Sequence, residues 1–320
     1  MMKIGPMLGK LVTGESVIRE FSTVGLDDQV QEKVYLQAGD HTLDISGNQW
    51  LLGLDPRILG VWVEKDEEKA LLEKSSVYRV YFMNAAAGEE TLCPRKALAS
   101  VDLDLFTTLE EDNGTLFLLR VLSCEIHHIN SLKARLLYWK FYKKPGVNFD
   151  RLKGVAAAYT YPRRVRIISF KQDADYNYIF PMDLLGDIRQ SGRYLLGMRH
   201  SNKVLTRIMD EKKIVVSEVP AVYKPLIYQL GRNHSASPPP LEELPFGVLP
   251  SREFGFYLPE WAESYKEIHI RKTVNLGSHM LLFGEWCCDN IIKPPTPRLH
   301  HIHFLHFLYQ KHRGTGYPAV

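Results

Sequence analysis

One stretch of the chain, residues 175–203, collects side chains that could hold a small ligand. Its amides and hydroxyls can form hydrogen bonds, its carboxylate can accept them, and its two cations precede a predicted helix. Free backbone N–H groups and the dipole of a helix start also favour an anion. The groups are Asn177, Asp183, Ser201, Asn202, Arg199 and Lys203. The stretch predicts a site for a phosphorylated ligand; ordinary capping of the helix by Ser201 or Asn202 is the alternative.

The elements around this stretch are mostly strands. Runs of apolar, β-branched or aromatic residues bounded by Gly, Pro or Asp indicate strands. In the second half of the chain we expect strands at 165–170, 179–185, 194–199, 214–218, 267–270 and 280–287, and a helix at 204–209. A Pro-rich loop lies around residues 237–240, and an aromatic segment, 302–309, ends the chain.

The first half of the chain is also expected to consist mostly of strands. Strands are expected at 42–45, 50–54, 58–63, 78–82, 101–108 and 116–124, with a helix at 66–74. The Asn113-Gly114 pair between two β-rich runs predicts a hairpin. An aromatic run, 136–142, closes this first β-rich unit.

The order of elements suggests a weak internal duplication. Residues 116–119 followed by Cys124 resemble residues 280–283 followed by Cys288, although any two β units can share such patterns. The stretch opposite residues 199–203 is then 64–68, which carries four carboxylates that would repel an anion. We therefore expect two tandem domains, 1–155 and 156–320, with the ligand in the second and the first as its structural partner.

Composition excludes several classes of protein. A net charge of +3 without a basic block gives no reason to expect a nucleic-acid partner. Hydrophobic and charged fractions of 45% and 24% are those of a globular protein, and no apolar run reaches membrane-spanning length. Four cysteines without a CxxC pair and a start without a signal peptide fit a cytoplasmic protein.

Other kinds of site have weaker support. The histidines near the C-terminus are His300, His301, His303, His306 and His312. On a strand, His301 and His303 would share one face and His300 and His306 the other, half-buried or exposed and without a carboxylate at ligand spacing, so we expect no metal. A nucleophile elbow and a GxGxxG dinucleotide fingerprint are both absent from the sequence.

Five segments of the second half together resemble the flavin reductase-like, FMN-binding split-barrel family. They are residues 165–170, 177–183, 196–203, 228–235 and 276–285. The most specific is Leu276-Gly277-Ser278-His279, which precedes an apolar strand. The resemblance covers residues 163–317 and implies a mainly β fold with a few helices, here two tandem split-barrel-like domains.

The resemblance also implies a cofactor and its site. FMN would bind noncovalently, often at a homodimer interface, which a duplicated chain could form within itself as a pseudo-dimer. By position, Asn177, Pro181, Met182 and Asp183 would lie near the isoalloxazine ring. The phosphate would be held by Arg199, Ser201, Asn202 and Lys203. Further lining residues would be Gly231, His234 and His279.

The expected activity is that of an NAD(P)H:flavin oxidoreductase, in which no side chain need act as acid or base. The segment 172–178 is short and charged, and the loop 235–251, which contains the Pro-rich segment 236–250, resembles an insertion over the substrate pocket. The second interpretation is therefore a non-catalytic flavin-binding or assembly module. A third is a pyridoxamine-phosphate-oxidase-like or haem-binding use of the same barrel.

Overall fold

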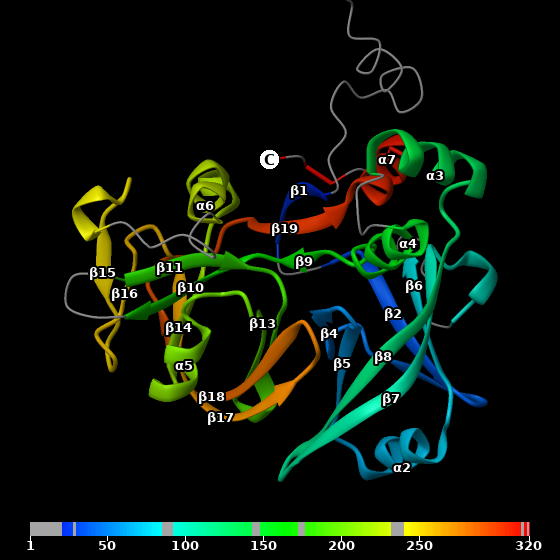
Figure 1. Cartoon of the computed structure of the whole chain (residues 1–320), viewed down its shortest axis with the longest axis horizontal. Helices are drawn as coiled ribbons and strands as arrows, with labels where there is room; N and C mark the ends of the chain where they lie inside the picture. Colours follow the sequence, from blue (N-terminus) through cyan, green and yellow to red (C-terminus); the bar gives the residue numbers. More distant parts are fainter. Residues whose placement is uncertain are drawn as a thin grey trace, which may run out of the picture.

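A computed structural model describes residues 21–27, 30–84, 92–142, 148–171, 177–231, 240–314, 317, 318 and 320. Within them the protein forms two β-rich units side by side, with a small sheet spanning both (Figure 1). Among the described helices, none is long and apolar enough to cross a membrane.

The first unit contains a sheet of seven described strands and the helices that follow it. Its elements are β2 (Glu32–Ala38), β3 (His41–Asp44), β4 (Gln49–Leu54), β5 (Arg57–Val63), α2 (Asp66–Lys74), β6 (Tyr78–Asn84), η2 (Pro94–Lys96), β7 (Ala99–Glu111), β8 (Gly114–Ile126), α3 (Ser131–Leu137), the π-helical turn η3 (Tyr138–Tyr142) and α4 (Phe149–Ala158).

The second unit contains the other sheet of seven. Its elements are β10 (Arg166–Lys171), β11 (Asn177–Met182), β12 (Leu185–Ile188), η4 (Arg189–Ser191), β13 (Arg193–Arg199), α5 (Leu205–Glu211), β14 (Lys213–Glu218), η5 (Ala221–Tyr223), α6 (Lys224–Leu230), η7 (Leu241–Glu243), β15 (Val248–Pro250), β16 (Tyr257–Pro259), β17 (Ser264–Asn275) and β18 (His279–Ile291).

The two sheets have the same topology. The strand order is β3-β2-β6-β7-β8-β5-β4 in the first and β11-β10-β14-β17-β18-β13-β12 in the second, with a helix after β5 and after β13. In each unit, a strand at one edge is followed directly in sequence by a strand at the opposite edge, so the sheet must curl back on itself. The predicted class, mainly β with two tandem split-barrel-like domains, is confirmed. The predicted boundary after residue 155 falls inside α4 and stays a prediction.

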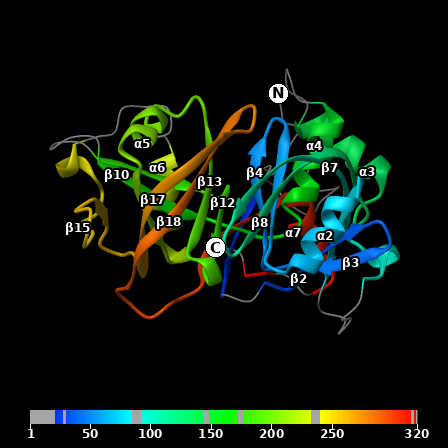
Figure 2. The same cartoon turned by 90° about the horizontal axis from the view of Figure 1, so that it is seen from below.

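The units pack through corresponding strands, as Figure 2 shows from below. Side chains of β4, β5 and β8 share one buried cluster with those of β12, β13 and β18. Each long hairpin also reaches the other unit. At the β17–β18 tip, the Ser278 N–H donates to the Asp55 carbonyl at 2.7 Å, and at the β7–β8 tip, Glu111 accepts from Arg193 at 3.2 Å. The contact therefore resembles a two-fold dimer interface within one chain.

A third, three-stranded sheet joins the ends of the chain. It consists of β1 (Phe21–Leu26), β19 (Arg298–His303) and β9 (Arg163–Arg164), in the order β1-β19-β9. The last helix, α7 (Phe304–His312), returns to the first unit, where Leu305 packs with Leu137 and Leu152 of α3 and α4. The C-terminal segment therefore contributes to both units.

Two expectations about the elements were wrong. The predicted strand 179–185 is two strands on opposite edges of the sheet, separated at Asp183 and Leu184. The aromatic run 136–142, for which no element was predicted, is helical and continues α3, whose start is capped by the Asn130 side chain accepting from the Leu132 N–H at 2.8 Å. His306 lies on α7 rather than on a strand, and His300, His303 and His306 are buried rather than exposed or half-buried.

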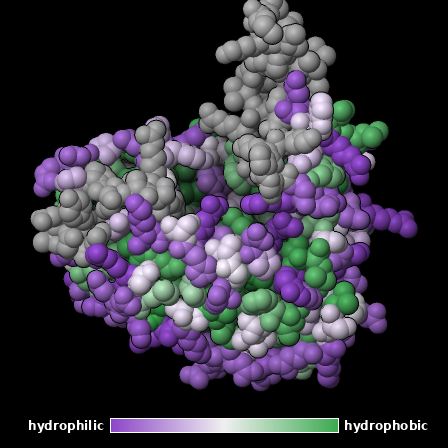
Figure 3. Space-filling view, viewed as in Figure 1, coloured by the Kyte–Doolittle hydropathy of each residue, from purple (hydrophilic) through white to green (hydrophobic). Residues whose placement is uncertain are grey.

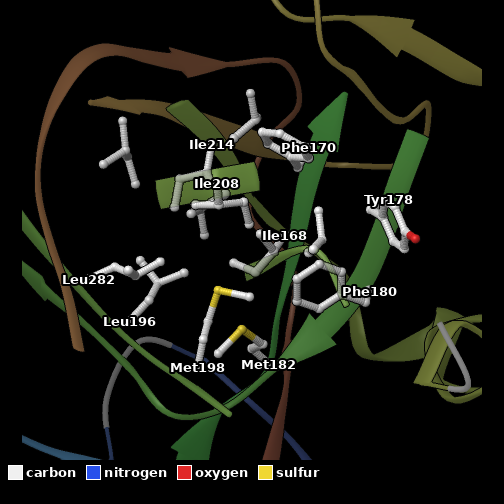
Figure 4. Close-up of a cluster of buried hydrophobic side chains, with 14 of the residues drawn as sticks. Ile168, Phe170, Tyr178, Phe180, Met182, Leu196, Met198, Ile208, Ile214 and Leu282 are labelled. Carbon is white, nitrogen blue, oxygen red and sulfur yellow. The ribbon is translucent and has the colours of Figure 1, made fainter. Parts of the chain in front are cut away.

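The core of the second unit fills its curled sheet. Aromatic side chains of β10 and β11 pack there against aliphatic side chains of β13, α5 and β14 (Figure 4). Met182 and Met198 lie next to each other at one end of this cluster. On the outer face in Figure 3, hydrophobic patches are separated by hydrophilic residues, as on an ordinary protein surface.

Candidate functional site

The candidate site is a cavity of about 540 Å³ whose walls come from both units. The first half of the chain contributes Phe21, Leu54, Arg151, Val155 and Tyr159. The second half contributes Pro181, Met182, Asp183, Leu184, Gly197, Met198, Arg199, Ser201, Asn202, Gly231, His279 and His301. Its size falls within the range of small-molecule and cofactor pockets.

Most residues predicted for a ligand site from the sequence line this one cavity. They are Pro181, Met182, Asp183, Arg199, Ser201, Asn202, Gly231 and His279. Lys203 is exposed and is not among the lining residues. Asn177 begins β11, at the end of the strand away from Pro181 and Met182. His234 lies outside the described residues, and the described part of the Pro-rich loop, residues 240–251, contributes no lining residue.

The break between β11 and β12 brings Asp183 into the cavity. Because β11 and β12 lie on opposite edges of the sheet, the chain must leave the sheet between them. On the other side of the sheet, Arg199 ends β13 and pairs with His279, which begins β18. The end of β13, the start of β18 and the break between β11 and β12 therefore all contribute to the cavity wall.

A chain of hydrogen bonds runs along one wall. The Tyr228 hydroxyl lies 2.6 Å from His301 Nε2, and His301 Nδ1 lies 2.7 Å from Asp183 Oδ2. The same carboxylate oxygen accepts from the Tyr159 hydroxyl at 3.0 Å. Tyr228 is exposed on α6, whereas Tyr159 is buried behind α4. The chain therefore connects the protein surface to a half-buried carboxylate of the cavity.

Burial and these partners shift the pKa values of Asp183 and Tyr159 in opposite directions. Burial alone would raise the pKa of Asp183, but the hydrogen bonds and charge of His301, with the Tyr159 hydroxyl, hold it below its usual value. Burial and the adjacent carboxylate raise the pKa of Tyr159 well above normal. At neutral pH the pair therefore consists of an anionic carboxylate and a neutral phenol.

His279 offers an unused polar atom at the cavity. Its side chain is 1% exposed, Nδ1 lies 2.7 Å from Ser278 Oγ, and its buried Nε2 has no hydrogen-bond partner among the described residues. Burial, with the nearby Arg199 and His200, lowers its pKa to about 4, so the imidazole is neutral at pH 7. A buried polar nitrogen without a partner is costly, which favours a ligand group next to it.

Two guanidinium groups give the cavity a cationic side. Arg199 comes from the end of β13 and Arg151 from the first turn of α4, so each unit supplies one. Helix α5 begins at Leu205, and the side chain of its N-cap residue, Val204, makes no capping hydrogen bond. Asn202 Oδ1 accepts from the Val204 N–H at 3.1 Å and so caps the turn that leads into α5, which agrees with the capping alternative for Asn202.

Sequence reasoning missed the lining residues Phe21, Arg151, Tyr159 and His301. Phe21 and Arg151 belong to the domain, 1–155, that was expected to be only a structural partner, and Tyr159 lies just after its predicted boundary. His301 was considered solely as a metal ligand, and no cluster of three metal-binding side chains occurs among the described residues. Each is brought to the cavity by pairing between segments far apart in sequence, such as β1 with β19, and no local pattern signals that.

The corresponding place in the first unit carries a buried tryptophan. By topology, the end of β5 before α2 matches the end of β13 before α5. There Trp62 is 1% exposed, and its Nε1–H donates to Glu64 at 3.2 Å. A Cβ added at Gly114 would come within 2.7 Å of the indole ring. A buried indole thus stands in the first unit where the second unit has Arg199.

No protein-family model and no curated protein sequence match this chain. Solved structures similar to it include an NADH:FAD oxidoreductase from Streptomyces globisporus, at 16% identity over 47% of this chain and 88% of that one, with a TM-score of 0.42. An FMN-binding protein from Thermus thermophilus is 15% identical over 43% of this chain and 81% of its own, with a TM-score of 0.38. The styrene monooxygenase flavin reductase from Pseudomonas putida S12 is 14% identical over 45% of this chain and 89% of its own, also with a TM-score of 0.38.

These structures are of the kind that the sequence motifs indicated, flavin reductases and FMN-binding proteins. Each likeness covers less than half of this chain at low identity, so it identifies neither a substrate nor an activity.

Proposed function

We propose that the cavity between the units binds FMN noncovalently and that the protein is a flavin reductase-like oxidoreductase supplied with electrons by NAD(P)H. The observation that carries the proposal is the composition of the cavity wall. Apolar side chains, a neutral buried imidazole with an unused nitrogen, and two guanidinium groups surround a volume of about 540 Å³. A flavin mononucleotide presents the matching groups, since it has a flat apolar ring with polar edges and a charged phosphate.

The residues fit the two ends of such a ligand. Pro181, Met182 and Met198 offer apolar and thioether surface for an aromatic ring system. His279 Nε2, with its partner Ser278 on the other ring nitrogen, can form a hydrogen bond to the polar ring edge. Arg199, Arg151 and Ser201 can bind the phosphate, because guanidinium groups form paired, charge-assisted hydrogen bonds to phosphate oxygens.

When bound, the flavin would supply the hydride and electron chemistry, and the protein would supply placement and electrostatics. Asp183 keeps a negative charge and orients His301 through Nδ1. His301 Nε2 in turn holds the Tyr228 hydroxyl at 2.6 Å. This wall can therefore pass a proton between the surface and the cavity.

We also propose that the chain is an intramolecular pseudo-dimer that arose by internal duplication, with a boundary near residue 155. The two sheets share one strand order and meet through corresponding strands. In such an arrangement the second unit keeps a flavin site, while in the first unit Trp62 occupies the equivalent place. One flavin per chain follows from this difference.

Two measurements on the full chain test the proposal. Protein purified without added flavin is examined by visible absorption and then titrated with FMN by calorimetry; oxidation of NADH and NADPH is followed separately with excess FMN. FMN binding together with NAD(P)H oxidation supports a reductase. Binding without oxidation would support the second interpretation, a non-catalytic flavin-binding or assembly module. Absence of binding would refute both.

A further inference from the structure

A second cavity, of about 410 Å³, lies beside the first and shares Asp183 with it. Its wall combines the first unit's Gln49 and Trp50, from β4, with the second unit's Asp187, from β12. Four arginines line it, namely Arg163, Arg164, Arg166 and Arg189, against two carboxylates, Asp183 and Asp187. The proposed flavin chemistry makes no use of this space.

Arg163 is the most unusual group in this wall. Its side chain is buried, with 5% of the residue exposed, and its guanidinium donates to the carbonyl of Ala158 at 3.1 Å and to Gln49 Oε1 at 2.8 Å. Among the described residues no carboxylate lies at ion-pair distance from it, whereas Arg166 has Glu218 as its partner. A buried charge with only neutral partners is costly, so an anion in the cavity would compensate it.

Gln49 adds a free donor next to Arg163. An arginine can only donate, so the Gln49 oxygen must face it and the amide NH₂ must point the other way. Gln49 is 2% exposed, and its Nε2 is buried without a hydrogen-bond partner among the described residues. The amide orientation follows from the hydrogen-bond network. The buried Gln49 NH₂ therefore lacks a hydrogen-bond acceptor. An oxygen atom of a bound ligand would supply one.

The described lining of the cavity contains more arginines than carboxylates, and ion pairs connect most of them. Arg164 and Arg298 share Glu218 with Arg166, at 3.5 and 3.9 Å, and Arg298 also pairs with Glu263 at 3.5 Å. Among the described residues, Arg164, Arg166 and Arg298 thus share the carboxylates Glu218 and Glu263. On the opposite side, Asp187 Oδ2 lies 3.5 Å from both Arg189 and Lys266, and its buried Oδ1 has no described partner. That oxygen can accept a hydrogen bond from the same ligand.

We propose that this second cavity binds a small organic anion of mononucleotide size. Its phosphate or carboxylate oxygens face Arg163 and Gln49, and a hydrogen-bond donor elsewhere on the ligand faces Asp187. The half-buried ring of Trp50 lines the cavity between these groups and offers surface to an aromatic base. The inference does not rest on flavin binding in the first cavity.

The isosteric substitution Gln49→Glu tests this directly. It gives Arg163 a carboxylate partner at the same position and removes the unpaired donor, so it should leave the melting temperature unchanged or higher. The same negative charge should repel an anion, so affinity for the ligand should fall at least about tenfold. Gln37→Glu, the same chemical change on β2 away from the cavity, is the matched control.

The full chain is titrated by calorimetry with AMP, inorganic phosphate and acetate. We expect AMP to bind more tightly than the two simple ions, to lose affinity in Gln49→Glu, and to bind equally well to the Gln37→Glu and Arg199→Glu variants. Failure of all three probes to bind the wild-type protein would overturn the proposal. So would unchanged AMP affinity in Gln49→Glu, or loss of AMP binding in Arg199→Glu, which would locate AMP in the first cavity.

Discussion

His301 Nδ1 lies 2.7 Å from Asp183 Oδ2, although 118 residues separate them in sequence. Asp183 occupies the break between β11 and β12, and His301 lies on β19, which pairs with β1 from the start of the described chain. This contact fixes the three-stranded sheet to the second unit. The wall of the first cavity thus depends on segments close to both ends of the described chain.

Replacing Asp183 with Ala should destabilise the protein. The change leaves the buried Tyr159 hydroxyl and His301 Nδ1 without their shared acceptor, which costs about 1–3 kcal/mol in the free energy of unfolding. Urea unfolding measures the loss. Asp40→Ala, at an exposed turn, is the control and should be nearly neutral. Equal stability of the two variants would mean that the Asp183 contacts contribute nothing to folding.

The charge reversal Arg199→Glu should weaken FMN binding by about tenfold or more, because it replaces a charge-assisted hydrogen bond with repulsion. Lys203→Glu, four residues further along, changes the same charge on a residue outside the cavity lining. Fluorescence titration with FMN compares the two variants. Equal losses of FMN affinity in both variants would indicate long-range electrostatic attraction rather than phosphate binding by Arg199. Unchanged FMN affinity in Arg199→Glu would show that Arg199 does not contact the ligand.

Gly197 is where the two units approach most closely on β13. A Cβ added there would lie 1.8 Å from the carbonyl oxygen of Leu52, a main-chain atom of the other unit. Gly197→Ala should therefore lower the free energy of unfolding by about 1–3 kcal/mol or more, as overpacking does. Gly47→Ala is the matched control, since its Cβ would meet nothing within 4 Å. Similar melting temperatures for both variants would argue against the close contact.

Buried histidines should make the protein sensitive to mild acid. Burial lowers the pKa of His128, His300 and His303 to about 3 and that of His279 to about 4, from 6.5. The unfolded chain then takes up protons before the folded protein does. The free energy of unfolding should fall as pH drops below 6.5 and should keep falling toward pH 4.

Urea unfolding at several pH values measures this slope. In His303→Asn, which retains a side chain able to cap α7, the slope should be smaller, whereas in His41→Gln, at an exposed position, it should be unchanged. A stability that stays constant between pH 7 and pH 5 would contradict the buried, neutral state of these histidines.

Local patterns predicted much of the fold. The helix 66–74 matches α2 (Asp66–Lys74), because its charged surface and Leu72 on the buried side are a local signal. The Asn113-Gly114 turn joins β7 and β8, with Gly114 at a φ of 154°. The cationic stretch after β13 and the His279 element were likewise found from sequence, since each belongs to one continuous segment that ends or begins a strand.

What could not be predicted depends on contacts between distant segments. Tyr159 and Arg151 reach the cavity only because the first unit packs against the second, and His301 does so only because β19 pairs with β1 and β9. The run 179–185 is apolar except for Asp183, and its division into strands on opposite edges reflects closure of the sheet, which a local pattern does not specify. Helix α7 follows β19 without a Gly or Pro between them, and its N-cap is His303, an uncommon capping residue.

Calorimetric titration of the full chain with FMN tests the central claim most directly. The account predicts saturable binding of about one FMN per chain, because Arg199 and a cavity are present in the second unit and Trp62 fills the corresponding place in the first. Arg199→Glu should weaken this binding while the protein remains folded. Absence of FMN binding, or two equivalent sites per chain, would contradict the account.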